Sequence, residues 1–130
     1  MYEVARVVGR HCIGSLRDGN PLLLNDEDFL KTALTLAAEA AGATLLQIAT
    51  HKFDPQGLTG FALLAESHIS IHTWPEYGFA SVDCYSCGEH TNPESACRSL
   101  RDSFQSGDSS LQLFDRSFIP SRAPLPVACP

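Results

Sequence analysis

The chain has 130 residues, of which 44% are apolar and 18% charged, so it can bury the core of one domain and is not of the intrinsically disordered class. Its formal charge of −6 and isoelectric point near 5.2 argue against a nucleic-acid partner, which would require a basic surface. An acidic surface suits a small cationic ligand better, although it is also the ordinary choice for solubility.

The sequence indicates neither a membrane partner nor secretion. No apolar run approaches the length of a membrane span, and the first residues lack the apolar core of a signal peptide. The five cysteines are odd in number and irregularly spaced, which fits free thiols better than a disulfide framework. We therefore expect a cytoplasmic protein.

In chain order, the first expected element is a strand over residues 2–9, which alternate loosely between apolar and polar. A helix follows the N-cap pair Asn25-Asp26, carries apolar residues at helical spacing, and ends at Gly42. Residues 44–53 predict a second strand.

The middle of the chain predicts a turn-rich loop over residues 54–60, followed by three strands. The strand-like runs cover residues 61–66, 67–74 and 79–86, with an obvious break only at Pro75–Gly78. No helical pattern separates these runs.

The last third of the chain predicts a helix, a strand and an irregular tail. The helix is capped at Asn92, has Pro93 at its first position, and runs to about Gln105. The final strand covers residues 110–119, and residues 120–130 form the tail.

The predicted order, β-α-β-β-β-α-β, indicates an α+β fold: a two-layer sandwich with both helices on one face of a largely antiparallel sheet. We expect residues 1–130 to form a single domain of this kind. The other sheet face would lack cover, because so short a chain has no further helices to supply. Pairing of two copies, sheet against sheet, is the natural solution.

The segment 67–74, SHISIHTW, concentrates groups that titrate or attack carbonyls. Because alternate residues of a strand share a face, His68, Ser70 and His72 should lie opposite Ser67, Ile69 and Ile71. A half-buried strand with a solvated polar face is the ordinary explanation of this pattern.

Metal binding is a second interpretation. Two histidines four apart, such as His68 and His72, can chelate a metal on a helix, but this segment is a poor helix and no third ligand is evident nearby. Cys84-x-x-Cys87 lacks the second cysteine pair of a zinc ribbon. We therefore expect no metal.

The run AESHISIHTWPEYGFASVDCYSCGEHTNP, residues 65–93, closely resembles the core of the prokaryotic S-adenosylmethionine decarboxylases. The resemblance extends over residues 23–60 and fades in residues 1–8 and after about residue 105. It implies a self-processing enzyme that makes a pyruvoyl cofactor from its own chain. It also implies homodimers, as an α/β/β/α four-layer sandwich with sites near the interface.

The resemblance implies cleavage of the bond between Glu66 and Ser67 by the chain itself. In the family, the serine hydroxyl attacks the preceding carbonyl, and β-elimination then releases two chains, here 1–66 and 67–130. Ser67 would become the pyruvoyl group, whose ketone forms a Schiff base with the substrate amine and accepts electrons during decarboxylation.

The resemblance also assigns roles to side chains. His72 matches the proton acceptor of processing, and Cys87 matches the proton donor of catalysis. Thr59 stands where the family usually has the serine that supplies the processing hydroxyl, and Gln56 replaces a histidine often seen in that loop. Cys84 matches no functional residue and is expected in the core.

Three further matches concern the substrate. Phe53 and Trp74 resemble the aromatic residues that enclose the adenine, and Glu76 resembles the acid that holds the ribose hydroxyls. Aromatic faces also suit the sulfonium cation of S-adenosylmethionine.

The leading hypothesis is therefore an S-adenosylmethionine decarboxylase that supplies the aminopropyl donor for spermidine synthesis. One alternative is a pyruvoyl enzyme that decarboxylates another amino acid, arginine or ornithine. Another is a regulatory partner that does not process itself and would stay full length after purification.

Overall fold

The computed structural model describes residues 6–126. Its helices and strands follow in the order β1 (Gly9–Arg17), η1 (Leu23–Asn25), α1 (Glu27–Ala40), β2 (Leu45–Lys52), β3 (Leu58–Leu64), β4 (Ser67–Trp74), η2 (Pro75–Tyr77), β5 (Phe79–Cys87), α2 (Pro93–Ser103) and β6 (Asp108–Asp115), where η marks a short 3-10 helix. The six strands form one sheet in the order β2-β3-β4-β5-β1-β6, and every neighbouring pair is antiparallel.

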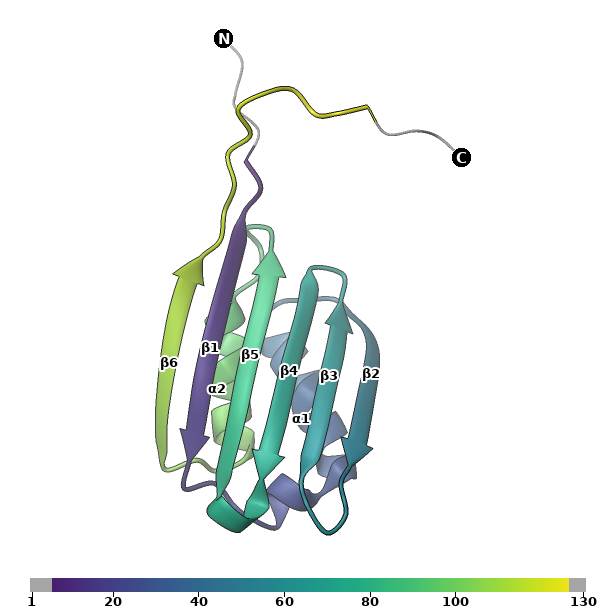
Figure 1. Cartoon of the computed structure of the whole chain (residues 1–130), viewed down its shortest axis with the longest axis vertical. Coiled ribbons are helices and arrows are strands. Elements are labelled where there is room, and N and C mark those ends of the chain that lie inside the picture. Colours follow the sequence, from purple (N-terminus) through teal and green to yellow (C-terminus); the bar gives the residue numbers. More distant parts are fainter. Residues whose placement is uncertain (1–5, 127–130) are drawn as a thin grey trace.

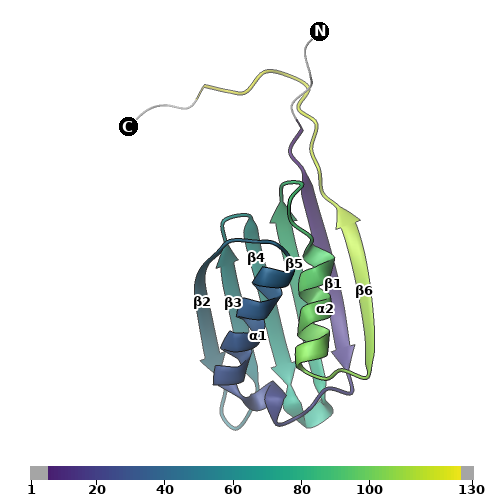
Figure 2. The ribbon, with the colours of Figure 1, turned by 180° about the vertical axis from the view of Figure 1, so that it is seen from behind.

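Both α-helices cover the same face of this sheet, and the opposite face is bare (Figures 1 and 2). The expected α+β fold with two layers is therefore confirmed. With 14 and 11 residues, α1 and α2 fall short of the roughly 20 that a membrane-spanning helix needs, so residues 6–126 hold no candidate span.

The helices begin where the sequence predicts. Asp26 caps α1 by accepting a hydrogen bond from Phe29 N at 3.0 Å, and Asn92 caps α2 through Ser95 N at 3.2 Å. Apolar side chains on the covered faces of helices and sheet then bury each other, including Leu30, Leu34, Ile69, Ile71, Leu100 and Phe104. Each of these six side chains is fully buried.

The prediction of a first strand over residues 2–9 is wrong for residues 6–8, since β1 begins at Gly9. Residues 2–5 lie outside the described residues, and Val7 makes only an isolated bridge to Phe118. The strand is Gly9–Arg17, whose buried face carries the small residues Cys12 and Gly14 besides one leucine. Because small residues give a weak hydrophobic signal, the period-two pattern there is easily missed.

Two other boundaries differ from the predictions. β3 begins at Leu58, so Thr59 lies in the strand and not in the preceding loop. β6 covers Asp108–Asp115, so residues 116–119 lie beyond its end. The described cysteines (Cys12, Cys84, Cys87 and Cys97) are free as predicted, and Cys129 lies outside the described residues.

The bare face mixes exposed apolar side chains with a polar centre. Its apolar residues include Ile13, Phe61, Leu63, Trp74 and Phe114, which are 39–46% exposed. At the centre, the Asp83 carboxylate accepts hydrogen bonds from His11 Nε2 at 2.7 Å, His68 Nε2 at 3.0 Å and the Ser70 hydroxyl. Burial by itself would raise the pKa of Asp83, but these donors outweigh it and hold the pKa below its ordinary value.

Gly60 lets α1 approach the sheet, and its replacement tests that packing. A Cβ at Gly60 would lie 2.8 Å from Leu30 and 3.1 Å from Leu34, so Gly60→Ala should lower the free energy of unfolding. We expect a loss of about 1–3 kcal/mol, as for other overpacked cores, in urea denaturation at fixed protein concentration. Gly107→Ala is the control, because its nearest neighbour would lie 3.5 Å away; equal losses in both variants would contradict this packing.

Asp83→Asn tests the polar centre of the bare face. At pH 7 we expect a loss of about 1.5–3 kcal/mol in the free energy of unfolding, since hydrogen bonds to a charged group are lost. The folded-state pKa lies below the unfolded value of about 3.9, so this contribution is present above about pH 4 and fades as pH falls further.

The difference in the free energy of unfolding between wild type and Asp83→Asn should therefore become smaller as pH falls. Urea denaturation from pH 7 to pH 3 measures this difference. Asp102→Asn removes a carboxylate whose side chain is 71% exposed and should change little at any pH. A difference that stays constant across the series would show that the charge of Asp83 does not stabilise the fold.

Candidate active site

β4 divides its side chains as the sequence predicts. Ile69 and Ile71 are fully buried against the helices, while His68, Ser70 and His72 lie on the bare face. The groups with predicted roles in processing and binding gather at the two ends of this strand.

The first end is the junction of Glu66 and Ser67, where β4 begins. Ser67 has a φ of +147°, a conformation that side-chain-bearing residues rarely adopt. Such a backbone costs about 1–3 kcal/mol and persists only where its surroundings hold it. Strain is thus concentrated at the bond predicted to break.

Two donors from one residue hold the carbonyl of Glu66. Cys87 donates its backbone N–H to Glu66 O at 2.9 Å, and its thiol lies 3.1 Å from the same oxygen. The predicted proton donor is therefore beside the predicted cleavage site. Cys84 is fully buried, and burial raises the pKa of its thiol to about 12, which agrees with the expected core role.

The Glu66 side chain is also held. Its carboxylate accepts hydrogen bonds from Thr44 N at 2.9 Å, from Thr44 Oγ1 at 3.3 Å and from His90 Nε2 at 2.9 Å. The hydrogen bond from His90, followed by that from the Thr44 backbone, holds the pKa of Glu66 below its ordinary value. Thr44 and His90 were not predicted as site residues, because the resemblance assigns no role to either and only the fold brings them to Glu66.

The other end of β4 forms a pocket of about 390 Å³. Its lining includes every residue predicted to bind substrate and both predicted processing side chains: Phe53, Trp74, Glu76, Thr59 and His72. The structure therefore brings together five residues that the sequence placed in four different segments.

Hydrogen bonds order two pairs in this pocket. Thr59 Oγ1 and His72 Nδ1 are 3.0 Å apart, so the threonine hydroxyl reaches the histidine despite its added methyl. If the ring donates its Nδ1–H to that hydroxyl, Nε2 is left free to accept a proton. Gln56 Nε2 donates to Glu76 Oε2 at 2.9 Å, which gives Gln56 a position in the pocket wall.

The two ends of β4 are far apart within one chain. At about 3.3 Å per residue, His72 lies about 16 Å along the strand from Ser67, and Trp74 lies about 23 Å from it. One chain thus holds two half-sites: a Ser67 half-site (Glu66, Ser67 and Cys87) and a pocket half-site (Phe53, Thr59, His72, Trp74 and Glu76).

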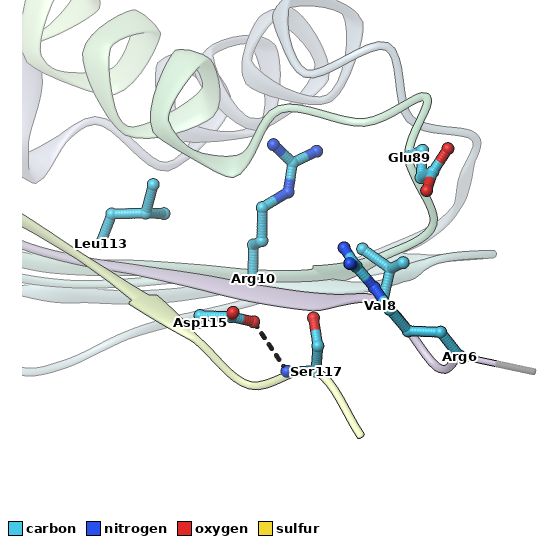
Figure 3. Close-up of a pocket in the computed structure, with 7 residues that line it drawn as sticks. All are labelled: Arg6, Val8, Arg10, Glu89, Leu113, Asp115 and Ser117. Carbon is cyan, nitrogen blue, oxygen red and sulfur yellow. Dashed lines mark hydrogen bonds between the residues drawn. The ribbon is translucent and has the colours of Figure 1, made fainter. Parts of the chain in front are cut away.

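Two other features lie outside these half-sites. His11, His68 and Asp83 each offer one ligand atom, all within 4.8 Å of one another, but these atoms already hydrogen-bond among themselves. A hollow of about 380 Å³ lies between the start of β1 and the end of β6, lined by charged residues that include Arg10 and Asp115 (Figure 3). Arg10 donates to Thr91 O, and none of the predicted site residues lines this hollow.

Comparison with known proteins gives one consistent result. The family model for S-adenosylmethionine decarboxylase matches residues 10–117. The S-adenosylmethionine decarboxylase proenzyme of Parasynechococcus marenigrum (strain WH8102) is 58% identical over 110 residues, which cover 85% of this chain and 86% of the relative. The proenzyme of the same name from Methanococcus aeolicus is 52% identical over 95 residues, covering 73% and 81%.

A solved structure agrees with these relatives. The adenosylmethionine decarboxylase of Aquifex aeolicus VF5 has a TM-score of 0.81 to this chain at 30% identity, covering 93% of this chain and 100% of the other. The match thus extends over sheet and helices alike. The chain belongs to the S-adenosylmethionine decarboxylase family.

Proposed function

We propose that the chain cleaves itself between Glu66 and Ser67 and then decarboxylates S-adenosylmethionine, supplying the aminopropyl donor for spermidine synthesis. One observation carries this proposal: the strained Ser67 follows a carbonyl that the Cys87 N–H and thiol both contact. The relatives, which are named decarboxylase proenzymes, support the same activity.

Self-cleavage needs only groups of the chain. Ser67 Oγ attacks the carbonyl carbon of Glu66, the C–N bond breaks, and the released amine takes a proton, which converts the amide into an ester. A base then removes the α-proton of Ser67, and Glu66 leaves as a carboxylate. The remaining dehydroalanine takes up water and loses ammonia, which leaves a pyruvoyl group.

The residues at the Ser67 half-site fit this cofactor. The Cys87 N–H lies where the tetrahedral oxygen would form, and backbone donors stabilise such oxyanions. The pyruvoyl carbonyl supplies an electron sink for decarboxylation. The Cys87 thiol is near enough to the junction to donate a proton to the product carbon, the role that we propose for it.

The pocket half-site fits a nucleoside. Phe53 and Trp74 offer aromatic faces to the adenine and the sulfonium, and Glu76 can accept hydrogen bonds from the ribose hydroxyls. Gln56 holds the Glu76 carboxylate from one side and limits its rotation. Arginine and ornithine have neither an adenine ring nor ribose hydroxyls for these groups to bind.

We further infer a homodimer in which each active site combines the Ser67 half-site of one copy with the pocket half-site of the other. A base must lie within about 3 Å of the proton that it removes, whereas His72 lies about 16 Å from Ser67 in its own chain. If the two-fold axis ran perpendicular to the strands, between two facing sheets, the Ser67 half-site of one copy would lie opposite the pocket half-site of the other. The exposed apolar residues of that face support such an interface.

The intact mass of the purified wild-type protein tests self-cleavage. We expect two chains that divide after Glu66, the second beginning with a pyruvoyl group, because Ser67 supplies the nucleophile. Ser67→Ala should remain one chain without decarboxylase activity, since it has no hydroxyl to attack with. Cleavage of Ser67→Ala would contradict the mechanism, and an uncut wild type would indicate a regulatory partner.

Co-expression of two inactive variants tests the shared site. Mixed dimers of Ser67→Ala and Trp74→Ala chains carry one intact site each, so random pairing should restore about one quarter of the wild-type sites. Decarboxylation of labelled S-adenosylmethionine, with arginine as the alternative substrate, gives the readout.

The matched control combines Ser67→Ala with Cys87→Ala. Both changes lie in the Ser67 half-site, so their mixed dimers contain no intact site. The absence of restoration in the first pair would exclude a site shared between copies, and restoration by the control pair would show that Ser67 and Cys87 do not belong to the same half-site.

A further inference from the structure

The carboxylate of Glu66 is fixed although it takes no part in the bond changes of self-cleavage. Three hydrogen bonds reach it, two from Thr44 and one from His90, and Glu66 is only 9% exposed. Neither donor residue contacts the reacting atoms. The side chain next to the cleaved bond is thus anchored by two residues whose own atoms take no part in the bond changes.

His90 reaches this carboxylate from the loop between β5 and α2. The loop passes close to the ring because Gly88, at φ +95°, has no side chain: a Cβ there would lie 3.0 Å from His90 Cε1. The His90 side chain is itself 62% exposed, so its replacement removes the hydrogen bond without opening a cavity. The other bonds come from Thr44, which directly precedes β2.

Both ends of Glu66 are therefore held while Ser67 carries the strain. Cys87 N–H fixes the carbonyl, and the clamp, which we define as Thr44 and His90 on the Glu66 carboxylate, fixes the side chain. Rotation of the Glu66–Ser67 peptide could relieve the φ of +147° only by moving one of these anchors. The strain is consequently stored at the bond that breaks.

We propose that His90, assisted by Thr44, is a positioning residue for self-cleavage, which it promotes by holding the Glu66 carboxylate and so the carbonyl that Ser67 attacks. The inference rests on the proposed self-processing. It concerns the first step alone, the attack of Ser67 Oγ and loss of the C–N bond to form the ester. The later elimination removes the Ser67 α-proton and releases the main-chain carboxylate of Glu66, and neither event uses the clamped side chain.

The rate of cleavage of newly made protein, followed by intact mass, tests the clamp. Since a misplacement of about 1 Å can slow a reaction about 100-fold, we expect His90→Ala to slow cleavage by about tenfold or more. His90→Gln should recover part of the rate, because its amide can still donate to the carboxylate. Thr44→Val, which removes only the longer bond of 3.3 Å, should have a smaller effect.

Hydroxylamine identifies the step that is slowed, because it splits esters much faster than amides. A variant blocked in elimination, such as His72→Ala, should accumulate ester and be cut by hydroxylamine. His90→Ala should accumulate uncut amide, and hydroxylamine should not increase its cleavage. The neighbouring Glu89→Ala is the control, since Glu89 is exposed and lies in the same loop outside the clamp. It should cleave at the wild-type rate.

Each outcome bears on the clamp. Wild-type cleavage in His90→Ala, ester accumulation in it, or no recovery in His90→Gln would overturn the positioning role. Turnover per pyruvoyl group in the fraction that does cleave should stay at the wild-type value, because His90 acts before catalysis. Failure of the wild type to cleave would instead reject the proposed self-processing.

Discussion

The antiparallel register of β4 between β3 and β5 is the constraint on which every other feature of the site depends. It pairs Thr59 with His72 on one side and Ser67 with Ser86 on the other. Because side chains alternate across a strand, a slip of one residue would turn the histidines into the core and the isoleucines outward. The buried Ile69 and Ile71 make such a slip costly, so apolar packing on one face fixes the chemistry on the other.

At the start of β4, the strained Ser67 directly follows Glu66, which hydrogen bonds hold in place. A positive φ at Ser67 would relax if the neighbouring residue could move, and the bonds to the Glu66 carbonyl and carboxylate prevent this. The fold thus stores backbone strain at Ser67, next to the bond proposed to break, which is the arrangement expected of a chain that modifies itself. Cys87 connects the proposed processing and the proposed catalysis, because it contacts the carbonyl that Ser67 would attack and lies beside the residue that would become the pyruvoyl group.

The bare face explains how so small a chain could build a complete site. The two helices cover only one side of the six-stranded sheet. Within one chain, the length of β4 separates the nucleophile Ser67 from the pocket. Two copies related by a two-fold axis would solve both problems together, since the same contact buries apolar side chains and joins unlike half-sites. Hydrogen bonds from His11 and His68 partly compensate the charge of the Asp83 carboxylate, which can therefore lie at the centre of such a face.

The sequence by itself determined the order of elements after β1, both helix caps, and the residue types of the family motif, because these depend on neighbours along the chain. It did not locate β1, whose small buried residues weaken the periodic signal, and it gave no indication of Thr44, His90 or the His11–Asp83 contact. These groups are 22 to 72 residues from their partners along the chain, and only folding brings them together. Tertiary structure also decided which groups meet at the two ends of β4, because strand pairing and loop packing brought Cys87 to Glu66, and Phe53 and Thr59 to the pocket of His72.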